Sequence, residues 1–127
     1  MSTTSRIGIW ENGAVKSIYC HNDGYIEHNG DILYRCYSTD DEVQALIALG
    51  ALSSLDETIG IKTNFDIPEP DQCIAYHRDR GEELVISASS EAFFKNWEDY
   101  NYLFKNGEWL VSCGVTNYRL KPLKDYL

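Results

Sequence analysis

The densest group of polar side chains able to do chemistry lies at residues 76–83, Tyr-His-Arg-Asp-Arg-Gly-Glu-Glu. Arginine donates paired hydrogen bonds to phosphates and carboxylates, and a turn that contains glycine exposes backbone amides that bind anions. Aromatic rings beside such a turn stack on a nucleotide base. The predicted ligand-binding residues are Tyr76, His77, Arg78, Arg80, His21 and Tyr25. The alternative is a solvated hairpin tip whose arginines pair with neighbouring carboxylates.

A second constellation lies at residues 20–23, Cys-His-Asn-Asp. Neighbouring strand residues point to opposite faces, so Cys20 and His21 do not form a catalytic dyad. A metal-dependent hydrolase built on His21, Asp23 and His77 requires the fold to gather these residues, since their spacing matches no metal motif. The alternative is that Asp23 shapes a turn. The familiar nucleophile, zinc and phosphate-loop motifs do not occur, so we predict no catalytic residue, metal or cofactor.

Acidic residues outnumber basic ones by 20 to 11, so the 127-residue chain carries a net charge of −9. Most of this charge lies in residues 40–71, where eight acidic side chains accompany a single lysine, Lys62, for a local net charge of −7. These eight residues form the predicted protein-binding face: Asp40, Asp41, Glu42, Asp56, Glu57, Asp66, Glu69 and Asp71. Such a surface repels nucleic acids and anionic membranes and attracts basic proteins. The alternative is a surface that only confers solubility.

Two Asn-Gly pairs predict β-hairpins, because both residues accept the positive φ of a type I′ turn. The first pair is Asn12-Gly13, and the second is Asn106-Gly107. Folding residues 100–113 about the second pair places aromatic and apolar side chains together on one face of the hairpin. A third hairpin is expected from residues 72–77 to residues 82–87, with residues 78–81 as its turn.

Three helices are expected between the hairpins. Thr39 and Glu42 have the spacing of a capping box, which starts a helix whose apolar stripe ends before Gly50. A short helix is expected over residues 29–37. A third helix begins at Ser89 or Ser90, with Phe93, Phe94 and Trp97 predicted to face the core.

The order hairpin, two helices, hairpin, helix, hairpin predicts a single α+β domain over residues 1–127. We expect an antiparallel sheet built from three hairpins, with about three helices packed on one face. The four cysteines are far apart in the sequence, which favours unpaired thiols in the core. The polar N-terminus and the lack of a long apolar run predict a cytoplasmic protein.

Five stretches are distinctive in combination: residues 6–9 (RIGI), 15–25 (VKSIYCHNDGY), 42–55 (EVQALIALGALSSL), 75–83 (AYHRDRGEE) and 102–109 (YLFKNGEW). Together they resemble a widespread family of small proteins encoded by phages, prophages and other mobile elements. The resemblance covers most of the chain and implies no activity or catalytic residue. It implies a biological setting, that of a phage accessory protein, a class rich in antagonists of host defence.

Three functions follow as hypotheses. The first is a non-enzymatic phage protein that antagonises host defence by binding a basic host protein, such as a defence nuclease, through the acidic face. It would act as a nucleic-acid mimic, in the manner of an anti-CRISPR protein, without binding nucleic acid or a membrane. The second is a homo-oligomeric sponge that sequesters a small anionic signalling nucleotide. The third is the metal-dependent hydrolase.

Overall fold

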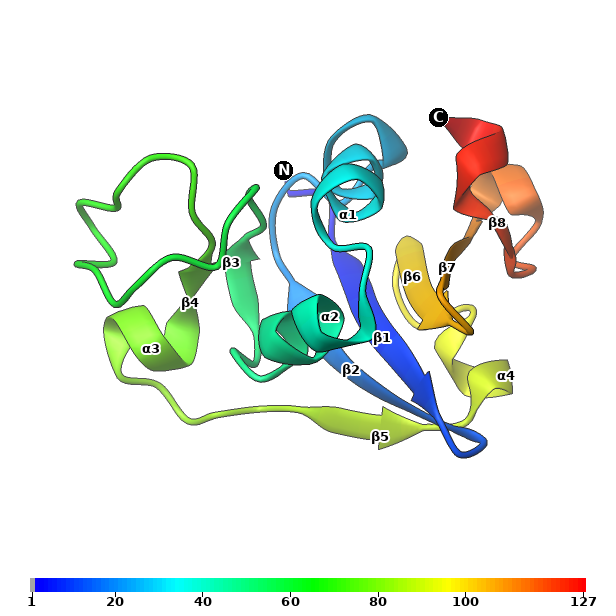
Figure 1. Ribbon diagram of the computed structural model, residues 1–127, viewed down its shortest axis with the longest axis horizontal. Coiled ribbons are helices and arrows are strands. Elements are labelled where there is room, and N and C mark those ends of the chain that lie inside the picture. Colours follow the sequence, from blue (N-terminus) through cyan, green and yellow to red (C-terminus); the bar gives the residue numbers. More distant parts are fainter. Residues whose placement is uncertain (1) are drawn as a thin grey trace.

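The computed structural model describes residues 2–127, which form an α+β fold around one mixed, mostly antiparallel sheet of eight strands (Figure 1). The strands are β1 (Ser5–Glu11), β2 (Ala14–Cys20), β3 (Leu52–Ser54), β4 (Ile74–Ala75), β5 (Ser87–Ser89), β6 (Tyr100–Lys105), β7 (Glu108–Cys113) and β8 (Lys121–Pro122). The helices are α1 (Asp31–Cys36), α2 (Asp40–Ile47), α3 (Tyr76–Arg80) and α4 (Glu91–Phe94). Short π and 3-10 turns complete the chain: η1 (Ile26–Gly30), η2 (Gly114–Thr116) and η3 (Leu123–Tyr126).

The strand order is β4-β3-β2-β1-β6-β7-β8, and β5 pairs with β2. The β1–β2 and β6–β7 hairpins have the predicted Asn-Gly turns, with Glu11 paired to Ala14 and Lys105 paired to Glu108. Strands β1 and β6 join these hairpins by parallel pairing, although about 90 residues separate them along the chain. The first and last parts of the sequence therefore form the centre of the sheet.

The main core lies on the face of the sheet that α1 and α2 cover (Figure 1). The capping box of α2 is confirmed: the hydroxyl of Thr39 accepts from the Glu42 amide, and the Glu42 carboxylate accepts from the Thr39 amide. On the same face Trp109 packs on Phe104, with ring centroids 5.2 Å apart, and its Nε1 donates to the Tyr37 carbonyl oxygen at 2.7 Å. This indole bond fixes the end of α1 to β7.

Helix α4 packs on the opposite face, so the expectation that all helices share one face is wrong. Ser90 caps α4, as predicted, by accepting from the Phe93 amide at 3.1 Å. Phe94 is fully buried against Gly8 of β1, whereas the side chain of Phe93 is 56% exposed. The short helix therefore presents one aromatic ring, that of Phe94, to the sheet. This ring fills the space that a Cβ at Gly8 would occupy.

The third predicted hairpin is also wrong, because residues 76–80 form α3 and residues 82–86 run on to β5 without pairing to β4. The helix ends at Gly81, which has a φ of +75° and donates its amide to the His77 carbonyl oxygen. The glycine that suited a hairpin turn is thus the C-terminal cap of a helix.

All four cysteines are unpaired, as expected from the sequence. Cys20, Cys73 and Cys113 are buried, and burial raises the pKa of the Cys20 thiol to about 12. A thiol with so high a pKa stays protonated and behaves as a small core residue. Along residues 2–127, no helix has the length and apolar character needed to cross a membrane.

We expect Gly8→Ala to lower the free energy of unfolding by about 1–3 kcal/mol, because overpacking strains a filled core. The added methyl carbon would lie 2.8 Å from Val15 Cγ1 and 2.9 Å from Phe94 Cε1. Urea denaturation measures the change. Gly114→Ala is the matched control, since a Cβ there meets no atom within 4 Å. Equal stability of the two variants would contradict the packing of α4 on this face.

Candidate functional site: an acidic groove beside α2

A surface hollow of about 410 Å³ lies between the N-terminal half of α2, the end of α1 and the chain that leaves β3. Its apolar lining comes from Cys36, Tyr37, Ala45 and Ile59, and its acidic lining comes from Asp41, Glu42 and Glu57. We call this hollow the acidic groove. Carboxylates therefore border an apolar floor within one concave site.

The capping box positions the acidic groups of α2. Asp40, Asp41 and Glu42 occupy the first turn, where the helix dipole favours negative charge. Hydrogen bonds from the Thr39 hydroxyl, and from the Ser38 and Thr39 amides, lower the pKa of Glu42. Glu42 is therefore held in place and ionised.

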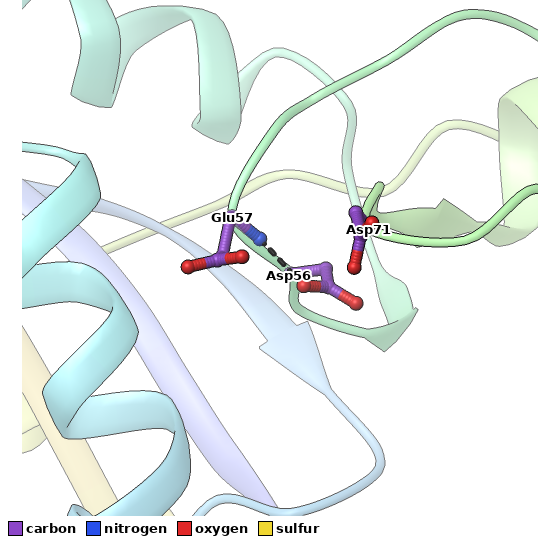
Figure 2. A group of neighbouring side chains, drawn as sticks. All are labelled: Asp56, Glu57 and Asp71. Atoms are coloured by element: carbon purple, nitrogen blue, oxygen red, sulfur yellow. Dashed lines mark hydrogen bonds between the residues drawn. The ribbon is translucent and has the colours of Figure 1, made fainter.

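Asp56 and Asp71 extend the acidic surface from Glu57, which lines the groove, to residues beyond it. Carboxylate oxygens of these three residues lie within 4.8 Å of one another, with Asp56 between the other two (Figure 2). The Thr58 amide and hydroxyl both donate to the Asp71 carbonyl oxygen, at 3.2 and 2.8 Å, and so hold the two segments together. Asp56 and Asp71 are fifteen positions apart in the sequence, and these bonds bring their two segments together.

This triad is the group of His, Cys, Asp and Glu side chains along residues 2–127 whose ligand atoms converge closely enough for a metal ion. Three carboxylates suit a hard cation such as Ca²⁺, which takes six to eight oxygen ligands. Water or main-chain oxygens would have to supply the remainder. His21, Asp23 and His77, the residues of the hydrolase hypothesis, do not form such a group.

Arg35 pairs with Glu57 at the border of the acidic groove. Its guanidinium bridges Asp31 at 2.8 Å and Glu57 at 3.1 Å, and all three side chains are nearly half exposed. Exposed ion pairs contribute little stability, and a competing cation can replace one partner. One arginine therefore offsets only part of the negative charge along the groove.

Two of the eight predicted acidic residues lie apart from this surface. Asp66 and Glu69 are exposed in the loop between β3 and β4, and neither lines the groove. The structure gathers Asp41, Glu42, Asp56, Glu57 and Asp71, with Asp40 in the same helical turn. The sequence missed the apolar floor, because Tyr37 and Ile59 meet only in the folded chain.

Arg78 of the predicted ligand-binding set is an internal structural residue. Its guanidinium donates to the carbonyl oxygens of Ile59 and Cys73, both at 2.9 Å, and to Asp79 at 2.9 Å. Asp79 in turn accepts from the Ala75 amide at 2.8 Å and the Thr63 amide at 3.0 Å. The Arg78–Asp79 pair thus joins the start of the β3–β4 loop to α3.

Asp79 remains ionised despite its burial. Desolvation by itself would raise the pKa of Asp79, but hydrogen bonds from Arg78 and from the two backbone amides outweigh it, so the pKa is lowered. The carboxylate therefore stabilises the fold in its charged form.

Arg80, by contrast, lies on the surface of an aromatic stack. Its guanidinium carbon is 4.5 Å from the ring centroid of Phe65 and 5.0 Å from that of Tyr76, and these rings stack at 5.5 Å. Arg80 also pairs with Glu82, as the hairpin-tip alternative anticipated for the arginines. Phe65 was not predicted, and its only sequence signal is an aromatic residue within a polar loop.

The remaining predicted ligand residues lie in separate settings. His77 Nδ1 bonds the Glu82 carbonyl oxygen at 2.7 Å. His21 bonds the Tyr19 hydroxyl at 2.8 Å through Nδ1, and Tyr25 packs on His28 with ring centroids 6.1 Å apart. None of these contacts connects His21 or Tyr25 to the Arg80 stack.

Asp79→Asn is expected to lower the free energy of unfolding by about 3–5 kcal/mol at neutral pH, because it leaves the Arg78 charge inside the protein without its partner. The folded-state pKa of Asp79 lies below the unfolded value of about 3.9. The stabilisation is therefore complete above that pH and is lost as the pH falls through the folded pKa. Denaturation of wild type and Asp79→Asn from pH 7 to pH 3 measures the difference between their free energies of unfolding, which should narrow as the pH falls. Glu82→Gln, which removes the exposed partner of Arg80, is the control. A stability difference between wild type and Asp79→Asn that does not change with pH would contradict the stabilising role of the Asp79 carboxylate.

Comparison with known proteins identified no relative: no protein-family model, no curated protein and no solved structure matches the chain.

Proposed function

We propose that this protein is a non-enzymatic binding protein that docks the acidic groove on a basic surface of another protein. The observation that carries the proposal is the convergence of carboxylates from two separate segments, α2 and the β3–β4 region, around one apolar-floored hollow. A sequence cluster of acids that served solubility alone would not need this tertiary convergence.

The groove has the chemistry to bind lysine or arginine side chains. The aliphatic stem of either residue packs on an apolar floor while its charged end meets carboxylates at the rim. Tyr37 and Ile59 provide apolar contact, and Glu42 and Glu57 provide charge. The total charge of −9 would also steer a basic partner toward the protein and accelerate association.

The narrower hypothesis is that the partner belongs to a host defence system. The resemblance to phage and mobile-element proteins supports it, and so does the density of negative charge, which suits a mimic of nucleic acid in the cytoplasm of a host cell. A defence nuclease is the class of partner that this hypothesis names.

We expect neutralisation of the groove to abolish partner binding. The groove variant combines Asp41→Asn and Glu57→Gln in the groove with Asp71→Asn in the adjoining triad. These changes keep side-chain shape, and asparagine suits position 71, where φ is +63°. Tagged protein is incubated with host lysate at about 50 and about 500 mM salt, because screening weakens exposed charge pairs over this range. Quantitative mass spectrometry then compares the retained proteins.

The matched control is Asp66→Asn, Glu69→Gln and Glu83→Gln, which changes the net charge from −9 to −6, as the groove variant does, at exposed residues outside the groove. We expect wild type and the control to retain a partner at low salt and the groove variant to lose it. Wild type should release the same partner at high salt. A partner that the groove variant retains as well as wild type does would overturn the proposal.

The Arg80 stack supports a second candidate function, the binding of an anionic nucleotide. The Arg80 side chain is half exposed on the Phe65 and Tyr76 rings, so a base and a phosphate could share this site. Arg78, whose guanidinium is bonded internally, does not contribute in this version of the hypothesis.

Arg80→Ala should weaken binding of a cyclic dinucleotide by about tenfold or more, since it removes both the charge and one layer of the stack. Isothermal titration calorimetry provides the affinity. Lys62→Ala removes an exposed cation from the β3–β4 loop, which also carries Phe65, and serves as the control. Equal affinity of the two variants, or no binding by wild type, would eliminate this site.

A further inference from the structure

The chain between α3 and the edge strand β5 exposes an extended apolar run. Leu84, Val85 and Ile86 are 44%, 50% and 36% exposed, and they lead directly into β5. The run is held in place, because Leu84 and Val85 lie against Gly50 just beyond the end of α2. Three adjacent exposed apolar residues with high β-propensity mark a surface that favours contact with another strand.

The backbone N and O atoms of Val85 lie against Gly50, whereas the opposite backbone edge of this run, to which the backbone groups of Leu84 and Ile86 point, has no backbone hydrogen-bond partner in the described part of the chain. Within residues 2–127, β5 pairs only with β2, so its other edge is open. Outside the strand ladders, no backbone hydrogen bond in these residues involves residues 83–86. In Figure 1, β5 and the segment that precedes it form the lower boundary of the molecule.

Natural proteins usually block such an edge with a charge, a proline or a bulge. Residues 84–90, Leu-Val-Ile-Ser-Ala-Ser-Ser, contain no charged residue and no proline. The run is therefore an unprotected template for strand addition in a protein that is otherwise strongly charged.

We propose that residues 84–89 form a dimer interface, in which the edge segment of one copy pairs antiparallel with the same segment of a second copy. Charge argues for this occupant. A basic partner is attracted to the acidic groove, whereas an uncharged edge fits an uncharged strand, and this chain supplies one. The proposal is independent of the function assigned to the groove.

The segment is self-complementary in sequence. A two-fold axis at Ile86 places this residue opposite its own copy, because two identical strands that share the same edge can only oppose residues of the same parity. The same register places Leu84 opposite Ala88, Val85 opposite Ser87 and Glu83 opposite Ser89, so no two carboxylates face each other across the ladder. The pair of Ile86 side chains lies at the centre, where an isologous interface excludes water best.

Val85→Lys should weaken dimerisation by about tenfold or more, because a lysine on an edge strand blocks pairing. The matched control is Ile61→Lys, which makes the same change at a residue that is 74% exposed in the β3–β4 loop. Sedimentation over about a hundredfold range of concentration measures the dimer, whose population depends on concentration. Amide hydrogen exchange of residues 84–88 locates the interface.

We expect wild type to form a dimer in which the amides of residues 84–88 are protected from exchange. The control Ile61→Lys should retain this dimer, and Val85→Lys should lose it. Added salt should strengthen this dimer, because each copy carries a charge of −9, whereas salt weakens binding at the groove. A monomer at all concentrations, or a dimer unaffected by Val85→Lys, overturns the proposal. Protection of this segment only when a different protein is added also overturns it and assigns the edge to that partner.

Discussion

Strand β1 is buried on both faces and paired along both edges, and the other layers of the protein depend on it. One face carries Ile7 and Ile9 toward α1 and α2, and the other carries Gly8 beneath Phe94 of α4. Antiparallel pairing with β2 and parallel pairing with β6 join the two ends of the chain. A side chain larger than glycine at position 8 would separate the second layer from the sheet.

Strands β3, β4 and β5 and the loop between β3 and β4 are attached to this central unit at the β2 edge. The long β3–β4 loop has little regular structure, so a few polar groups hold it: Arg78 and Asp79 at one end, and the Thr58 bonds to Asp71 at the other. The same bonds bring Asp71 to Asp56 and keep Phe65 near α3. Polar bonds in this region therefore position the charged and aromatic surface groups.

Two surfaces with opposite electrostatics result from this arrangement. The acidic groove attracts positive charge, and its interactions weaken with salt. The β5 edge is uncharged, and contacts there strengthen when salt screens the repulsion between copies. Since the edge meets the sheet at β2 and the groove lies beside α2, both could be occupied in one assembly, with each copy presenting its own groove.

Local features were predictable because the residues that cause them are neighbours in sequence. The Asn-Gly turns, the Thr39–Glu42 capping box and the Ser90 cap each involve residues at most three positions apart. The concentration of acidic residues at positions 40–71 was equally evident from the sequence. Which of these residues lie close together in the fold was not. Tertiary structure decided the parallel β1–β6 pairing, the side on which α4 packs, and the helix at residues 76–80. That helix competes with a turn of similar composition, and Asp79 favours it by bonding to Thr63, sixteen residues away. Short-range bonds are encoded by the sequence alone, whereas contacts between distant segments exist only once the chain has closed the loops that separate them.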